Sequence, residues 1–138
     1  MIESWAREDE RTLRLLELEG VGPLTASAVV ATVGDPSMFK NGRQMAAWLG
    51  LVPSQHSSGG KSRLGSITKR GDRYLRMLLI HGARTVLLKS SRGTAKHQDW
   101  IESLRLRRPD NVVAVAYAAK QARMMWAIMM GKQQLTAS

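Results

Sequence analysis

Two serines and two glycines stand together in "PSQHSSGGKSRLG", residues 53–65, between two apolar segments. A serine hydroxyl beside glycine can approach a phosphodiester closely, and neighbouring arginines can stabilise the charge that develops on phosphorus. Two other interpretations are a loop that cradles a nucleotide phosphate and a flexible linker. The surrounding sequence has to decide between these three.

The nucleotide-cradle interpretation fails on spacing. The required pattern is G-x-x-x-x-G-K-[ST]. If Gly60, Lys61 and Ser62 are its last three residues, its first glycine falls on Gln55. In addition, Pro53 lies upstream and no hydrophobic strand leads into the loop. A nucleophile-bearing loop and a linker remain.

Positive charge follows this loop directly. The net charge of the 138 residues is +10, divided as −2 over residues 1–60, +5 over residues 61–76 and +7 over residues 77–138. Such a basic block indicates a polyanionic partner, most often nucleic acid, although a solvated basic face is the alternative. The candidate contacts are the basic residues nearest the loop, namely Lys61, Arg63, Lys69, Arg70 and Arg73.

A second candidate contact lies near the start, where Gly-Val-Gly-Pro separates two helical patterns within residues 10–34. The first pattern turns Leu13 and Leu16 to one side and stops at Gly20; the second begins at Pro23 and ends at Gly34. The glycines permit positive φ, and the free amides of the second helix suit a phosphate oxygen. This resembles the helix-hairpin-helix motif, although an ordinary helix–helix corner remains the alternative. The candidate contacts are the four hairpin residues, Gly20, Val21, Gly22 and Pro23.

Helical periodicity dominates the rest of the chain, and no long alternating pattern predicts a strand. Leu75, Leu79, Gly82 and Val86 fall along one face of a helix. The sequence therefore predicts a mainly α, compact domain over residues 1–138, with one exposed Ser/Gly loop at residues 53–66.

Residues 110–131 are apolar on most sides and are predicted to form the buried central helix. Its start can be capped by Asp110 or Asn111. Val115 and Trp126 are expected to be largely buried.

Other chemistry is weakly indicated. The three histidines, His56, His81 and His97, lack ligand spacing, so no metal site is expected in this chain. Asp99 and Glu102 are spaced i,i+3, which is more typical of a solvated helix face than of an acid–base pair.

The compartment is indicated by what the sequence lacks. It has no cysteine, and its first residues are not a secretory signal. Its apolar runs are shorter than the roughly 20 residues of a membrane span. We expect a cytoplasmic protein without membrane contact.

Several blocks together resemble the C-terminal domain of insertion-sequence transposases of the 110/116/902 family. They are the hairpin, "GDPSMFKNGRQMAAWLGLVP", the Ser-Gly loop and "ITKRGDRYLRMLL". The resemblance covers roughly residues 10–130. It implies a DNA recombinase whose serine forms a phosphoserine link with DNA, and this position matches Ser58, with Ser57 as the alternative.

The resemblance also implies a bacterial, nucleoid-associated protein and several partners. In this family a RuvC-like acidic domain that binds magnesium precedes the serine domain, and some members use a bridge RNA as a guide. The sequence here leads straight into the hairpin, so we expect a truncated product, an isolated domain or a stand-alone remnant that is inactive by itself. No cofactor is expected in this chain, and a homo-oligomer is expected. The alternatives are a non-catalytic DNA-binding module and an RNA-binding protein.

Overall fold

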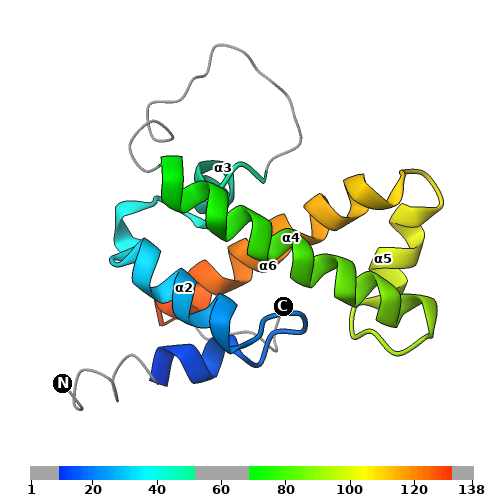
Figure 1. Cartoon of the computed structure of the whole chain (residues 1–138), viewed down its shortest axis with the longest axis horizontal. Helices are drawn as coiled ribbons and strands as arrows, with labels where there is room; N and C mark the ends of the chain where they lie inside the picture. Colours follow the sequence, from blue (N-terminus) through cyan, green and yellow to red (C-terminus); the bar gives the residue numbers. More distant parts are fainter. Residues whose placement is uncertain (1–9, 52–68, 132–138) are drawn as a thin grey trace, which may run out of the picture.

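The computed structural model describes residues 10–51 and 69–131, and the described residues form helices and no strand (Figure 1). The mainly α prediction is confirmed. Residues 10–15 are helical. The elements that follow are α2 (Pro23–Val33), the 3-10 helix η1 (Pro36–Met38), α3 (Gly42–Trp48), α4 (Lys69–Ser91), α5 (Gln98–Arg105) and α6 (Asp110–Met129).

Helix α6 is the centre of the packing. It makes its most extensive contacts with α3 and α4 and also packs against α5. Figure 1 shows α4 crossing α6 in the middle of the molecule, with α2 and α5 toward opposite ends. The apolar residues of α6 fill the core because small alanines alternate with large side chains, and the buried ones include Val113, Ala114, Tyr117, Ala118, Ala122, Met125 and Ile128.

At α6, Val115 and Trp126 are largely buried, at the edge of the core, and the N-cap differs from the prediction. The indole Nε1 of Trp126 donates to the carbonyl oxygen of Pro36 at 3.0 Å, and this need for a polar partner keeps the ring near the edge of the core. The N-cap is Pro109, without a side-chain cap, because the Asp110 carboxylate is hydrogen-bonded to Arg105 instead.

The segment before the hairpin also differs from the prediction of one helix reaching Gly20. After residue 15 the chain tightens into turns, in which the Leu18 amide donates to the carbonyl oxygen of Leu15 at 3.0 Å. Leu15 and Leu18 are both buried, whereas Leu13 is 58% exposed. Turning the chain early brings two leucines three residues apart into the core together.

Side-chain caps fix the path from α2 to α3. Asp35 accepts hydrogen bonds from the amide and the hydroxyl of Ser37, at 3.0 and 2.7 Å, and these bonds lower the pKa of the Asp35 carboxyl. Asn41 accepts from the Gln44 amide at 2.9 Å, while Gln44 Oε1 accepts from the Lys40 amide at 2.8 Å. These caps direct α3 toward α6.

In the described part of the chain, no helix is both long enough and apolar enough to cross a membrane.

Candidate nucleic-acid interface

The hairpin rests against the middle of α4. Gly20 has φ +91°, a conformation that favours glycine, and a Cβ atom placed on it would lie 2.7 Å from Val86 Cγ2. A Cβ on Gly82 would overlap the carbonyl oxygen of Gly20. Both glycines are therefore required by the close contact between the hairpin and α4.

The residue before this contact is held from several sides. The carbonyl oxygen of Glu19 accepts hydrogen bonds from the Tyr117 hydroxyl, at 3.4 Å, and from Gln121 Nε2. The carboxylate of Glu19 accepts from the Lys96 amide at 2.8 Å and pairs with Lys89 Nζ at 3.5 Å. Burial, together with the Glu19 charge, raises the pKa of Tyr117, so its hydroxyl stays protonated as a donor.

Gly22 differs from Gly20. Its φ is −95°, so it does not use the positive φ that glycine permits, because the chain is already extended before Pro23. A Cβ on Gly22 would meet nothing within 4 Å. Neither backbone conformation nor packing within the described residues requires glycine here.

Helix α2 begins at the open side of this hairpin. Its N-cap, Gly22, supplies no side-chain hydrogen bond, and its first turn carries no acidic residue. Pro23 is exposed and Leu24 is 61% exposed, whereas Val21 is buried. The first turn of α2 consequently lacks a side-chain cap, and its first two side chains lie at the surface.

The structure places the other predicted contacts unevenly. The serine candidates and the first two basic candidates, Ser57, Ser58, Lys61 and Arg63, lie outside the described residues. Lys69 and Arg70 are in the first turn of α4, and their side chains are likewise not described. Arg73 is exposed on α4.

The chain before the serine segment is anchored in the core and lies beside α4. Leu51 is fully buried, and its amide donates to the carbonyl oxygen of Ala46 at 2.9 Å. Gly50 has φ +74°, and a Cβ on it would lie 3.4 Å from Cδ and Nη1 of Arg76 in α4. Residues 50–51 and the start of α4 are thus neighbours, and they border the segment that carries the serines.

The hairpin and the basic start of α4 form two separate groups. Arg73 and Gly82 are nine residues apart, which is about 14 Å along a helix and two and a half turns. Arg73 therefore lies on the side of α4 opposite to the hairpin contact. On the side of Arg73, Arg84 is also exposed, and a spacing of eleven residues, about three turns, was the sequence signal that would have found it.

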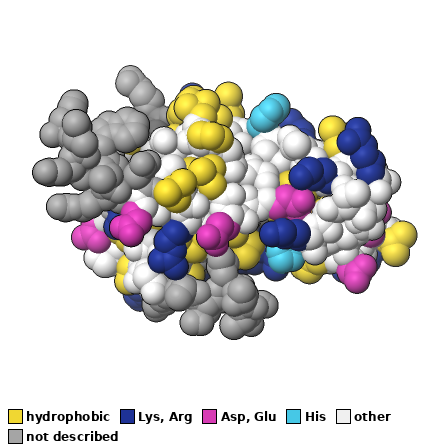
Figure 2. Space-filling model, turned by 90° about the horizontal axis from the view of Figure 1, so that it is seen from below, with side chains coloured by type: hydrophobic (Ala, Val, Ile, Leu, Met, Phe, Trp, Pro, Cys, Tyr) yellow, Lys and Arg dark blue, Asp and Glu magenta, His cyan; other side chains and the backbone are white. Residues whose placement is uncertain are grey.

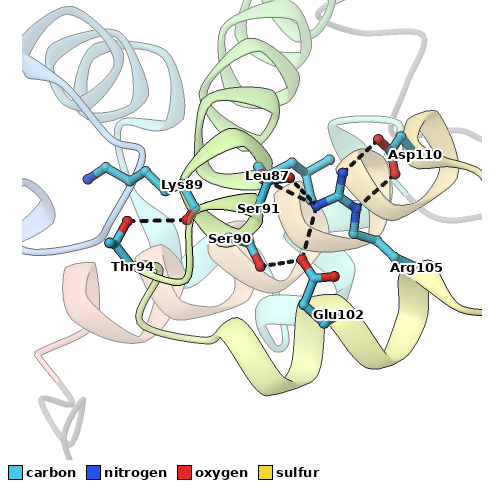
Figure 3. A network of polar contacts seen from close by, with 8 residues as sticks. All are labelled: Leu87, Lys89, Ser90, Ser91, Thr94, Glu102, Arg105 and Asp110. Carbon is cyan, nitrogen blue, oxygen red and sulfur yellow. Dashed lines mark hydrogen bonds and ion pairs between the residues drawn. The ribbon is translucent and has the colours of Figure 1, made fainter.

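At the other end of α4, Arg105 is the centre of a polar network (Figure 3). Its Nε and Nη2 donate to the two carboxylate oxygens of Asp110, at 3.0 Å each. Its Nη1 donates to the carbonyl oxygen of Leu87 at 3.2 Å, to Ser91 Oγ at 3.0 Å and to Glu102 Oε2 at 3.0 Å. One guanidinium joins α4, α5 and α6.

Glu102 belongs to this network rather than to a solvated pair with Asp99. The Ser90 hydroxyl donates to Glu102 Oε2 at 2.7 Å. This hydrogen bond, followed by that from Arg105, lowers the pKa of Glu102. Asp99 is exposed. Glu102 is a structural carboxylate.

Titratable groups elsewhere do not gather into a metal site. Within residues 10–51 and 69–131, no three His, Cys, Asp or Glu side chains come close enough to hold a metal ion. Burial, followed by the charge of Lys120, lowers the pKa of His97, whose ring centroid is 6.3 Å from that of Tyr117. Lys120 Nζ lies 5.0 Å from the centroid of Trp100, a cation–π contact.

Comparison with known proteins identifies the family. Residues 13–98 match the model of the IS116/IS110/IS902 transposase family. The matched span contains the hairpin, the serine segment and all of α4. This chain belongs to that family.

Curated relatives agree with this assignment. The chain is 56% identical over 128 residues to a probable family 20 transposase of Pseudomonas aeruginosa, covering 93% of this chain and 38% of the relative. It is 46% identical over 124 residues to the transposase for IS1111A of Coxiella burnetii, covering 90% and 34%, and 40% identical over 121 residues to that for IS1328 of Yersinia enterocolitica, covering 88% and 36%. The chain spans about a third of the length of these relatives. No solved structure matches it.

Proposed function

We propose that this chain is the DNA-binding, serine-bearing part of an insertion-sequence transposase, with Ser58 as the nucleophile and Ser57 as the alternative. The observation that carries the proposal is the family match over residues 13–98. It supports the assignment because that span combines the hairpin, the serine segment and the basic start of α4.

The proposed chemistry is a transesterification. Serine Oγ bonds to the phosphorus of a DNA phosphodiester, one phosphorus–oxygen bond to a sugar breaks, and the released sugar oxygen takes up a proton. Arginines at the start of α4 neutralise the charge on the phosphoryl oxygens. The magnesium ion that the resemblance implies does not fit the described acidic residues, since they form no cluster. We therefore assign it to an acidic domain of a longer protein and derive no step through it.

The hairpin is proposed as a phosphate contact that reads no bases. The open surface at Gly22 supports this proposal, because a glycine that the fold does not require can serve a close approach of DNA to the backbone. Glycine at position 20 is required by its positive φ and by packing, whereas at position 22, within the described residues, it is favoured as an N-cap but is required by neither.

The alternative function is a non-catalytic module that binds DNA or RNA. This alternative is favoured by the placement of the hairpin and Arg73 on opposite sides of α4. A guide RNA, an acidic domain and a second copy of the chain are partners in the proposed full assembly.

The chemistry is tested in a full-length protein that carries this domain. Ser58→Ala should abolish a covalent protein–DNA species trapped during strand cleavage and leave DNA affinity within a few-fold. If Ser57→Ala removes that species and Ser58→Ala does not, the nucleophile is Ser57. If neither variant changes it, the alternative module is supported.

The 138-residue chain alone provides a second test. It should bind duplex DNA without cleaving it. The logarithm of its affinity should fall with the logarithm of salt concentration, with a slope near −4 to −5 if about four to six phosphates are neutralised. Robust serine-dependent nicking by the chain alone would contradict the need for a second domain.

The two hairpin glycines give a matched pair for the DNA contact. Gly22→Ala should change the unfolding free energy by no more than about 0.5 kcal/mol, the cost of a poorer N-cap, and should weaken DNA binding because it blocks the approach to the backbone. Gly20→Ala should destabilise the fold itself. A Gly22→Ala variant with wild-type affinity would remove the hairpin from the interface.

A further inference from the structure

The connection between α5 and α6, residues 106–109, presents apolar and basic side chains together. Leu106 is 87% exposed, more than any other large hydrophobic side chain in the described residues. Arg107, Arg108 and Pro109 are also exposed. Figure 2, seen from below, shows basic, acidic and hydrophobic side chains at the right-hand end of the molecule, where α5 lies in Figure 1. We call residues 106–109 the α5–α6 tip; they lie outside the residues matched by the family model.

The α5–α6 tip is held rigidly at its base. Arg105 and Asp110, on its two sides, are joined by two parallel hydrogen bonds of 3.0 Å. The carbonyl oxygen of Leu104 accepts from the amides of both Arg107 and Arg108 at 2.9 Å. A corner fixed in this way loses little conformational entropy when a partner binds.

The arrangement is not explained by local stability alone. Two arginines at the C-terminal end of α5 interact favourably with the helix dipole. That accounts for their charge but not for the exposure of Leu106. None of the ion pairs of the described residues involves Arg107 or Arg108. Two arginines without an acidic partner beside an exposed leucine fit an anionic partner that also has apolar surface.

The α5–α6 tip also continues the side of α4 that carries Arg73 and Arg84, which also exposes Met77 and Leu88. Arg105 Nη1 binds Ser91 Oγ, and Ser91 is 18 residues, or five turns, after Arg73. Arg73, Arg84 and Ser91 therefore lie on one side of α4. The distance from Arg73 to Ser91 is about 27 Å along the helix, which is about 8 base pairs of B-form DNA.

We infer that the α5–α6 tip is a second DNA contact, in which Arg107 and Arg108 neutralise phosphates and Leu106 packs against sugars and base edges in the minor groove. The duplex runs from the start of α4, past Arg84, to the tip. This inference rests on the proposed function, because it takes DNA as the ligand of the chain.

The test uses fluorescence anisotropy of a labelled 30-base-pair duplex, titrated with the 138-residue chain at several salt concentrations. The double variant Arg107→Gln/Arg108→Gln should bind at least ten-fold more weakly at low salt, and its salt slope should be about 2 smaller, since each phosphate contact contributes about 0.9. Leu106→Ser should weaken binding several-fold and leave the slope unchanged. All three side chains are exposed, so the variants should keep the wild-type unfolding midpoint.

The control is Arg43→Gln/Arg123→Gln, which removes the same charge from exposed positions on α3 and α6. A loss of affinity equal to that of the tip double variant would mean that only net charge matters, and would overturn the inference. Unchanged affinity in the tip variants would also overturn it and would favour a protein partner at the tip. In that case weakened binding by Gly22→Ala would leave the proposed function standing, whereas no DNA binding by the wild-type chain would reject both.

Discussion

At the C-terminal end of α4, Leu87, Ser90 and Ser91 are hydrogen-bonded to Arg105 and Glu102, whereas at its N-terminal end the side chains of residues 73, 74, 76 and 77 are exposed. Both ends belong to one continuous helix of 23 residues. The difference is therefore one of side-chain partners and not of secondary structure.

The comparison separates two uses of polar groups. At the C-terminal end they satisfy one another across three helices, so their loss should reduce stability. At the N-terminal end arginines are exposed beside the serine segment, so their loss should reduce ligand binding with little effect on the fold. The boundary between the two regions is Gly82, where the hairpin crosses α4.

The largest effect is expected at this boundary. Gly82→Val should lower the free energy of unfolding by about 3 kcal/mol or more, since the new side chain overlaps the Gly20 carbonyl oxygen and the hairpin must move. Urea denaturation measures the change. Gly22→Ala is the control and should stay within about 0.5 kcal/mol of wild type. Equal stability of Gly82→Val and wild type would show that the two backbones are not in close contact.

The next largest effect tests whether the C-terminal end of α4 contributes more to stability than its N-terminal end. Arg105→Met keeps the aliphatic stem but leaves Glu102 and the Leu87 carbonyl oxygen without their guanidinium partner. The unfolding free energy should fall by about 2 kcal/mol. Thermal and urea unfolding of Arg73→Met, at the opposite end of the helix, provide the comparison and should show almost no change. A similar loss from both variants would remove the distinction between the ends.

For DNA binding, we expect the variant at the N-terminal end of α4 to have the larger effect. Arg73→Gln should weaken DNA binding by a few-fold and reduce the salt slope by about 1, because one phosphate contact is lost. Arg105→Met should leave the salt slope unchanged at a temperature where the variant is folded. In the wild type the Arg105 guanidinium is already hydrogen-bonded to Asp110 and is not available to a phosphate. Anisotropy titrations of both variants measure this. If Arg105→Met reduced the slope and Arg73→Gln did not, the assignment of the two ends would be reversed.

The smallest expected effect is a dependence of stability on pH. The folded state lowers the pKa of Glu102 below its ordinary value of 4.5, so the stability from its ionised form is present above pH 4.5 and is lost as the pH falls below it toward the folded pKa. Glu102→Gln should therefore show a flatter decline of melting temperature below about pH 4.5 than wild type. Melting curves from pH 7 to pH 3 test this, and parallel declines of the two proteins would contradict it.

Much of the fold could be predicted because its signals are local. Pro23 and Gly34 bound α2 as the sequence indicated. The spacing of Leu75, Leu79 and Val86 predicted the buried face of α4, since helical period alone determines which side chains share a face.

The candidate interface was less predictable because its geometry depends on distant residues. The two hairpin glycines are equivalent in the sequence, but only Gly20 has positive φ, because only Gly20 meets α4. The sequence also does not show that Arg73 and the hairpin lie on opposite sides of α4, because this depends on where the hairpin packs. The role of Ser58 stays a prediction, since it lies outside the described residues.

The hydrogen bonds to the Glu19 carbonyl oxygen also determine when, during synthesis, the hairpin can reach its final structure. Their donors, Tyr117 and Gln121, follow Glu19 by 98 and 102 residues. During synthesis the hairpin emerges from the ribosome long before these partners exist, and contacts between such distant residues form slowly. The hairpin is thus made well before the residues that fix it, and a nascent chain that stops before residue 117 has an incomplete hairpin whatever its local sequence favours.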